Sequence, residues 1–188
     1  MAELSDEQLV SKYLAGDEKS LEILVLRYFK PIYTFIFRNI GDAKAAEDIT
    51  QDVFVRVWKN LKKFKKERSF KTWIFSIAKN ASIDFLRKKK SVPLSRFENQ
   101  AGENILAERL VDPAPLPDEI FEREDAANLL RLAIDQLSLK YRQVLFLRYN
   151  DHFTFREIAE SLGESIDTIK SQHRRAVIAL KKTLQKLP

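Results

Sequence analysis

Apolar residues recur every three or four positions along most of the chain, and no segment alternates as a β-strand does. Ile49, Val53 and Val57, for example, follow one another at intervals of four, which places them on one face of a helix. Between residues 91 and 118 this periodicity fades, and four of the six prolines occur there. Proline blocks helix continuation, so this segment is predicted to be a flexible linker, with at most a short helix near residues 103–110. The pattern predicts an all-α protein with domains at 1–90 and 119–188.

Capping signals divide the first domain into several helices. Ser5 and Gln8 have the spacing of a capping box, in which each side chain satisfies a free backbone N–H at the helix start. A glycine followed by an aspartate, at residues 16–17 and again at 41–42, predicts the end of one helix and the capped start of the next. Pro31 lies within the apolar segment 20–37 and predicts a kink or a break.

The second domain ends in a helix–turn–helix pattern. Thr154 and Glu157 form another capping box, Gly163 ends that helix, and Ser165 can cap the next one. The second helix carries an apolar stripe, interrupted by the polar His173, that consists of Ile166, Ile169, Ala176, Leu180, Leu184 and Leu187. A short helix, a tight turn and a longer helix form the motif whose second helix enters the major groove of DNA.

The charge distribution supports a nucleic-acid partner. The net charge is +6, and residues 168–188 contain six basic residues and no acidic one. Clusters of this kind release counterions when they neutralise phosphates. Two observations keep a plain αα-hairpin open as an alternative: solvated basic helix faces are common, and the carboxylate of Asp167 repels phosphate.

A second basic segment lies in the first domain. Residues 56–90 contain 13 Lys or Arg residues against Glu67 and Asp84, a local net charge of +11. Within it, the apolar positions Phe70, Trp73, Ile74, Ile77, Ala81 and Phe85 share one side of a predicted helix that is expected to face the core. Aromatic and amide side chains among lysines suit unpaired bases. Whether Phe75 contacts bases or belongs to the core stays open, and the run Lys88–Lys90 is equally compatible with a solvated helix end.

Composition narrows the classes of protein. Cysteine is absent, so disulfides, thiolate metal sites and cysteine nucleophiles are excluded. No apolar run reaches the roughly 20 residues of a membrane span, and the acidic N-terminal sequence MAELSDEQ does not resemble a signal peptide. We therefore expect a cytoplasmic protein without membrane insertion, metal or cofactor.

Three motifs stand in the order and spacing of a known family: "AEDITQDVFVRVWKNLKKF" at 46–64, "SFKTWIFSIAKNASIDFLRKKK" at 69–90 and "LSLKYRQVLFLRYNDHFTFREIAESLGESIDTIKS" at 137–171. The chain resembles bacterial RNA polymerase sigma factors of the extracytoplasmic-function (ECF) type over nearly its whole length. The resemblance implies a non-catalytic specificity subunit that binds core RNA polymerase, recognises and melts the −10 element, and reads the −35 element. It also implies contacts with the clamp helices and flap of the polymerase, with duplex and single-stranded promoter DNA, and with an anti-sigma factor.

The resemblance carries over to individual positions. It assigns core-polymerase binding to Asp48, Gln51, Asp52, Phe54 and Val55. It assigns contacts with the −10 element to Phe64, Lys66, Arg68, Ser69, Lys71, Thr72, Phe75, Lys79, Asn80 and Arg87. It assigns contacts with the −35 element to Thr168, Lys170, Ser171, Gln172, Arg174 and Arg175. Asp167, Gln172 and His173 depart from the usual family pattern, where Gly, Arg and an apolar residue are common, which leaves the −35 sequence preference undefined.

Two other classes compete with this interpretation. A regulator with an N-terminal sensing domain would also explain residues 154–182, but not the aromatic and basic segment 64–90. A helical nuclease would need catalytic groups, and the candidates are His152, His173 and the carboxylates of Glu47, Asp48 and Asp52. No glycine-rich phosphate loop accompanies them among the four glycines.

Overall fold

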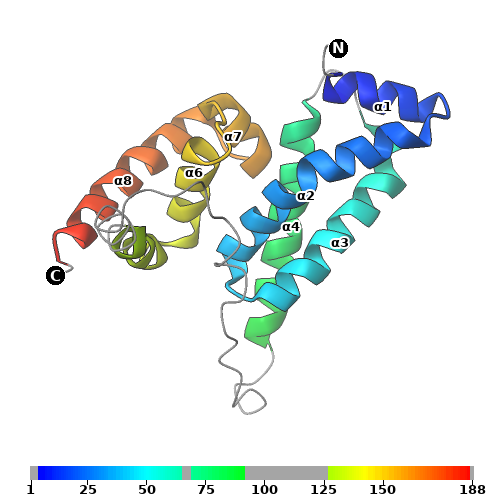
Figure 1. Ribbon diagram of the computed structural model, residues 1–188. Helices are drawn as coiled ribbons and strands as arrows, with labels where there is room; N and C mark the ends of the chain where they lie inside the picture. The colour runs from blue at the N-terminus through cyan, green and yellow to red at the C-terminus, as the bar shows by residue number, and fades with distance from the viewer. Residues whose placement is uncertain (1–3, 65–68, 92–126, 187–188) are drawn as a thin grey trace, which may run out of the picture.

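A computed structural model describes residues 4–64, 69–91 and 127–186, and every regular element in these ranges is a helix (Figure 1). The N-terminal module comprises α1 (Asp6–Leu14), α2 (Glu18–Ile40), α3 (Ala43–Asn60), the 3₁₀ helix η1 (Leu61–Lys63) and α4 (Phe70–Ser91). The C-terminal module comprises a helix at 127–135, α6 (Leu139–Tyr149), α7 (Phe155–Leu162) and α8 (Ile166–Leu184). The predicted all-α fold class is confirmed. The predicted linker beyond Ser91, with its short helix, lies outside the described residues.

Most local signals act as expected. The Ser5 backbone N–H donates to Gln8 Oε1 at 2.9 Å, and Ser5 Oγ accepts from the Gln8 N–H at 3.3 Å, so the capping box is present. Gly41 ends α2 with φ 73°, a left-handed conformation that glycine adopts without a steric penalty.

Two local predictions were wrong in detail. Asp17 occupies the N-cap position of α2 without capping a backbone N–H, because its carboxylate accepts from Ser20 Oγ at 2.8 Å instead. The predicted break at Pro31 does not occur, since α2 continues through this residue to Ile40. Buried Tyr28 and Ile32 on either side of the proline hold the two halves of the helix against the same core, which offsets the missing backbone hydrogen bond.

The N-terminal module packs three long helices around aromatic and branched side chains. Gly41 and Asp42 join α2 to α3, and these helices run antiparallel (Figure 1) with α4 packed against both. The side chains of Phe35, Val53 and Ile74 have at most 1% of their surface exposed. Phe35 meets Phe75 of α4 edge to face, with ring centroids 5.4 Å apart. At about 25 cal/mol per Å² of buried apolar surface, such side chains supply most of the stability of a module of this size.

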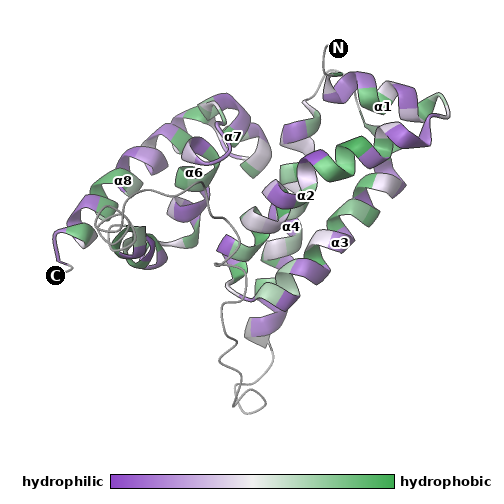
Figure 2. Ribbon diagram, viewed as in Figure 1, coloured by the Kyte–Doolittle hydropathy of each residue, from purple (hydrophilic) through white to green (hydrophobic). Residues whose placement is uncertain are grey.

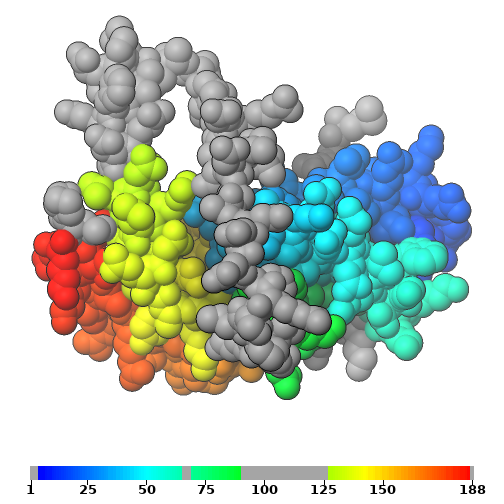
Figure 3. Space-filling view, turned by 90° about the horizontal axis from the view of Figure 1, so that it is seen from below, coloured from blue at the N-terminus to red at the C-terminus, as the bar shows by residue number. Residues whose placement is uncertain are grey.

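The two modules share a hydrophobic core. Phe153, in the loop between α6 and α7, is fully buried and packs against Phe75 of α4 with centroids 5.0 Å apart. Phe146 of α6 lies 6.3 Å from Phe35 of α2. Figure 3 shows atoms of the C-terminal module, in yellow to red, lying against those of the N-terminal module. The sequence pattern did not predict this contact.

Two lysines reinforce the contact between the modules. Lys71 Nζ donates to the Asp151 carbonyl oxygen at 2.7 Å, and Lys79 Nζ donates to the Leu162 carbonyl oxygen at 3.0 Å. Lys71 Nζ also lies 4.1 Å from the centroid of the Phe153 ring, a cation–π geometry. Both lysines belong to α4, so this helix bears most of the interface.

Asp151 in the same loop makes stability depend on pH. Burial raises the pKa of its carboxyl group from 3.8 to about 6, and its Oδ2 atom is buried without a hydrogen-bond partner. The folded protein therefore binds the Asp151 proton more tightly than the unfolded chain does. The associated stability is fully present below about pH 4 and is lost as the pH rises through 6.

The substitution Asp151→Asn is expected to raise the free energy of unfolding at pH 7.5 by about 1 kcal/mol, a figure already discounted for partial exposure. It should flatten the stability profile between pH 4 and 6. Urea titrations of both proteins at pH 4.5 and 7.5 measure the effect. An equal stability difference between the two proteins at both pH values would contradict it.

Candidate functional site

Helix α8 presents a basic face to solvent. Ser165 caps its start by accepting from the Thr168 N–H at 3.1 Å, and Gly163 ends α7 in the left-handed conformation with φ 67°. Ile169 and Ala176 are fully buried, which fixes the orientation of the helix on the module. Figure 2 shows hydrophilic and hydrophobic residues interleaved along α8. Of the predicted −35 contacts, Lys170, Arg174 and Arg175 are exposed, while Thr168, Ser171 and Gln172 are half-buried.

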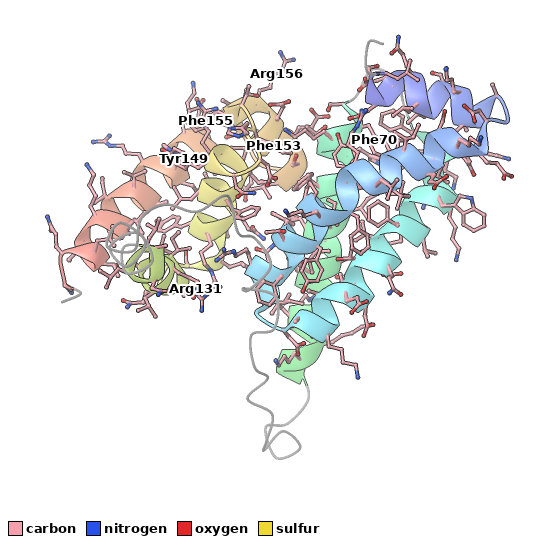
Figure 4. The ribbon with its side chains drawn as sticks, viewed as in Figure 1. Phe70, Arg131, Tyr149, Phe153, Phe155 and Arg156 are labelled. Atoms are coloured by element: carbon pink, nitrogen blue, oxygen red, sulfur yellow. The ribbon has the colours of Figure 1, made fainter. Side chains whose placement is uncertain are left out.

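The structure explains the polar His173 in the apolar stripe. Its Nε2 atom lies 3.0 Å from Tyr149 Oη of α6, within hydrogen-bond distance. Its ring meets Phe155 of α7 edge to face at 5.2 Å. Burial and, secondarily, the charge of Arg148 lower the pKa of His173, which favours the neutral ring. Figure 4 shows Tyr149 and Phe155 near one another where α6, α7 and α8 meet. His173 thus joins α8 to its two neighbours.

The predicted −10 contacts are divided by the structure into three groups. Phe64, Thr72 and Phe75 are buried, so the core interpretation of Phe75 describes its place here. Lys71 and Lys79 contact the C-terminal module through the bonds described above. Asn80 and Arg87 are exposed and Ser69 is half-buried, whereas Lys66 and Arg68 lie outside the described residues. Whether these residues contact DNA remains a prediction.

A polar cavity of about 330 Å³ beside Asn80 contains residues that the sequence did not single out. It is lined by Arg56, Asn60, Lys63, Trp73, Ile77 and Asn80. These residues come from α3, η1 and α4, so only the folded module brings them together. An indole ring beside guanidinium, ammonium and amide groups can stack on a base and donate hydrogen bonds to its edge. A hint existed in the sequence, because Arg56, Asn60 and Lys63 follow one another at helical spacing.

An apolar patch with an acidic border covers the outer side of α2 and α3. Phe29 of α2 stacks on Phe54 of α3 with centroids 6.1 Å apart. Leu26, one turn before Phe29, is 72% exposed, and Val55 is 43% exposed. The border consists of Asp48, Gln51 and Asp52, all exposed on α3. We call Leu26, Phe29, Phe54 and Val55 with this border the α2–α3 patch. A central apolar area with a polar rim is the usual anatomy of a protein interface.

A larger apolar cavity, of about 600 Å³, opens between the helix at 127–135, α6, α8 and the end of α2. Leu130, Leu145 and Leu180 are among its apolar walls. Its basic residues are Arg38, Arg131, Arg142 and Lys181, and Asp135 is its acidic one. Figure 4 labels Arg131 on this side of the C-terminal module. A cavity of this composition fits an apolar side chain or helix face with acidic flanks.

The carboxylates considered for a nuclease lie apart from the histidines. Glu47, Asp48 and Asp52 are exposed on α3, whereas His152 and His173 belong to the C-terminal module. Among the residues that the structure describes, no group of three or more His, Cys, Asp or Glu residues could hold a metal ion. Within the same residues, no helix combines the length and apolar character needed to cross a membrane.

The fold and these surfaces define a two-module helical protein with a helix–turn–helix, and comparison with known proteins identifies its family. The family model Sigma-70 region 2 matches residues 24–92, and Sigma-70, region 4 matches residues 127–180. The ECF RNA polymerase sigma factor SigW of Bacillus subtilis (strain 168) is 31% identical over 186 residues, covering 98% of this chain and 100% of the relative. The chain belongs to the ECF sigma factors.

Solved structures show the same fold. The sigma factor RpoE of Bartonella quintana, in complex with the anti-sigma factor NepR, has a TM-score of 0.68 at 22% identity, over 89% of this chain and 98% of that one. CnrH, in complex with the cytosolic domain of CnrY, has a TM-score of 0.66 at 23% identity, over 97% of this chain and 99% of that one. As a sigma factor, the chain binds RNA polymerase and DNA in promoter-specific transcription initiation, and sigma factors are known as non-catalytic specificity subunits.

Proposed function

We propose that residues 1–90 form a region 2 domain that binds core polymerase and recognises and melts the −10 element. Residues 119–188 form a region 4 domain that reads the −35 element, with 91–118 as the flexible linker. The observation that carries the proposal is the pairing of a capped basic recognition helix with a separate module that has both an apolar protein-binding patch and a polar cavity beside a basic helix. A DNA-binding regulator would have no use for the second module's surfaces.

The α2–α3 patch is the proposed contact with the clamp helices of the polymerase. Asp48, Asp52 and Val55 follow at intervals of four and three and therefore share one helix face. Val55 and Leu26 supply exposed apolar area beside the stacked Phe29 and Phe54 rings. A partner with a matching apolar strip and basic flanks would cover this patch. Leu26 and Phe29 thereby join the five residues predicted from the sequence.

The polar cavity beside Asn80 is the proposed site for an unpaired base of the −10 element. Trp73 offers a stacking surface, and Arg56, Asn60 and Lys63 offer donors at the rim. Extracting a base from the duplex costs a few kcal/mol, and stacking on an aromatic ring returns about 1–3 kcal/mol per base. Phe64, Lys66, Arg68, Ser69, Lys71, Thr72, Phe75, Lys79 and Arg87 complete the proposed −10 surface.

The exposed face of α8 is the proposed reader of the −35 element. Arg174 and Lys170 can contact guanine or phosphate, and Gln172 can contact adenine through its amide. Thr168, Ser171 and Arg175 complete this surface. His173 does not belong to it, because its ring already bridges Tyr149 and Phe155.

The large apolar cavity of the C-terminal module is proposed to receive the flap of the polymerase. Its apolar walls and basic residues fit an amphipathic segment that carries acidic groups. Both similar solved structures are complexes, one of them with an anti-sigma factor by its description, so we also propose that an anti-sigma factor regulates this protein.

Reconstitution with core RNA polymerase tests the proposed function. The purified chain is expected to bind core polymerase and to start transcription at a restricted set of genomic promoters, which sequencing of the 5′ ends of the transcripts would identify. A C-terminal helix–turn–helix regulator would bind DNA without core polymerase and would not change where transcripts begin. Promoter-independent transcription, or failure to bind core polymerase, would overturn the proposal.

A further inference from the structure

Two surfaces with distant targets lie side by side in this structure. Lys79 of α4 donates to the carbonyl oxygen of Leu162, the last residue of α7, at 3.0 Å. The next residue, Gly163, begins the turn into α8. The −10 and −35 elements are separated by about 25 base pairs, or about 85 Å of straight duplex at 3.4 Å per base pair. One chain in this arrangement cannot reach both elements.

We propose that the arrangement is a closed resting form of the free protein, in which the C-terminal module covers the face of α4 that the −10 strand requires. Promoter binding then requires the modules to separate. This inference rests on the proposed function, since it takes α4 as part of the −10 surface.

The closed form uses the same side chains that DNA would use. The ammonium groups of Lys71 and Lys79 donate to carbonyl oxygens of the C-terminal module, so they are not available to phosphate oxygens. The Phe75 ring is 1% exposed and packs on Phe153, which is itself fully buried. Module closure and −10 binding therefore exclude one another by direct competition for α4.

The loop that supplies Phe153 is shaped for this contact. His152, just before it, has φ 55°, in the left-handed region that non-glycine residues seldom adopt. The Phe153 N–H donates to the Leu147 carbonyl oxygen at 2.9 Å, and Arg148 donates to the Phe153 carbonyl oxygen at 2.8 Å. These bonds hold the backbone of Phe153 against α6, while its ring extends to α4 (Figure 4).

The closed form leaves the polymerase-binding surface open. Leu26 and Val55 of the α2–α3 patch are 72% and 43% exposed in it. Core polymerase can therefore bind the closed protein, whereas the −10 strand cannot. Separation keeps the modules on one chain, because the 35 residues from 92 to 126 can extend to about 115 Å. The device withholds DNA binding from the free protein without preventing polymerase recruitment.

A distance measurement tests closure. The chain has no cysteine, so Lys19→Cys and Lys182→Cys, at exposed positions in the two modules, accept spin labels uniquely. The free protein is expected to give one narrow distance distribution, and the complex with core polymerase and promoter DNA one that is longer by tens of Å. A free protein with a broad distribution, or one that matches the promoter complex, would overturn the proposal.

A substitution tests the competition for α4. Phe153→Ala should broaden the distance distribution and raise affinity by about five- to tenfold, because it removes the cost of opening. The probe is a fluorescent single-stranded oligonucleotide with the −10 sequence of a promoter that the reconstituted enzyme transcribes. Unchanged affinity in a folded Phe153→Ala protein would contradict the proposal.

The milder Phe153→Leu keeps the apolar volume and serves as the matched control. It carries the test if the helical circular dichroism signal of Phe153→Ala is lost, and it should then broaden the distribution and raise affinity to a smaller extent. A Phe153→Leu protein with parental distances and parental affinity would in that case overturn the proposal. The distance in the free protein reports closure whether or not the oligonucleotide binds, so failure of closure and failure of the proposed function are distinguishable.

Discussion

Val55→Lys is expected to weaken binding to core RNA polymerase by about 100-fold while leaving the fold intact. Val55 is 43% exposed at the centre of the α2–α3 patch, so the lysine costs little in the free protein and sits on the same helix face as Asp52. In the complex, the same ammonium group would be buried among apolar side chains. The loss at a central interface residue is about 2–4 kcal/mol, of which about 2.7 kcal/mol corresponds to 100-fold.

Ile178→Lys is the matched control for this prediction. Ile178 is another β-branched residue on a helix surface, 57% exposed, and it belongs to none of the proposed contact surfaces. Fluorescence anisotropy of labelled protein titrated with core polymerase gives the dissociation constants. Equal weakening by both substitutions would indicate a nonspecific effect of charge, and no weakening by Val55→Lys would remove the α2–α3 patch from the interface.

Arg174→Ala is expected to reduce transcription from −35-dependent promoters by about 10- to 100-fold, with core binding unchanged. Arg174 is exposed on α8, and the helix is held by its cap and by buried Ile169 and Ala176, so the loss of the guanidinium does not disturb its position. Loss of a bidentate contact with a base costs about 1–3 kcal/mol of discrimination. Gln172→Ala should act in the same direction.

The control for this second prediction lies on the same helix. Lys182 is exposed near the end of α8, away from the capped start, and Lys182→Ala should leave promoter use within about twofold because an exposed charge at that distance is screened. Transcription is compared on promoters with intact and scrambled −35 sequences. If Arg174→Ala weakens both equally, with a salt slope reduced by about one, then Arg174 contacts phosphate and not a base. An unchanged ratio and unchanged slope would exclude Arg174 from the interface.

The predictable part of the fold depended on interactions within a few residues. The capping boxes at Ser5 and Thr154 and the glycine ends at Gly41 and Gly163 each join groups three to five residues apart, so their geometry is present in the residue order. Pro31 shows the limit of such signals. The local rule predicts a kink or a break, but the packing of α2 in the core favours a continuous helix.

The candidate site was predictable where a residue type carries its chemistry on an exposed helix face. The basic face of α8 and the acidic border of α3 follow from spacing alone. The polar cavity was missed because Trp73 meets Arg56 and Asn60 only after α3 and α4 pack together. His173, a departure from the family pattern, became intelligible only through its contacts with Tyr149 and Phe155.

The sequence by itself determined the helices, their caps, the amphipathic faces and the two basic segments, because these depend on the period of the α-helix and on neighbouring side chains. Only the tertiary structure decided that Phe75 is buried by Phe153 and that Lys71 and Lys79 donate to carbonyl oxygens about 80 positions later. The same lysine can face phosphate or a carbonyl oxygen with equal local preference. Which one it meets depends on how the modules dock, and docking is a sum of many contacts between segments that no local pattern relates.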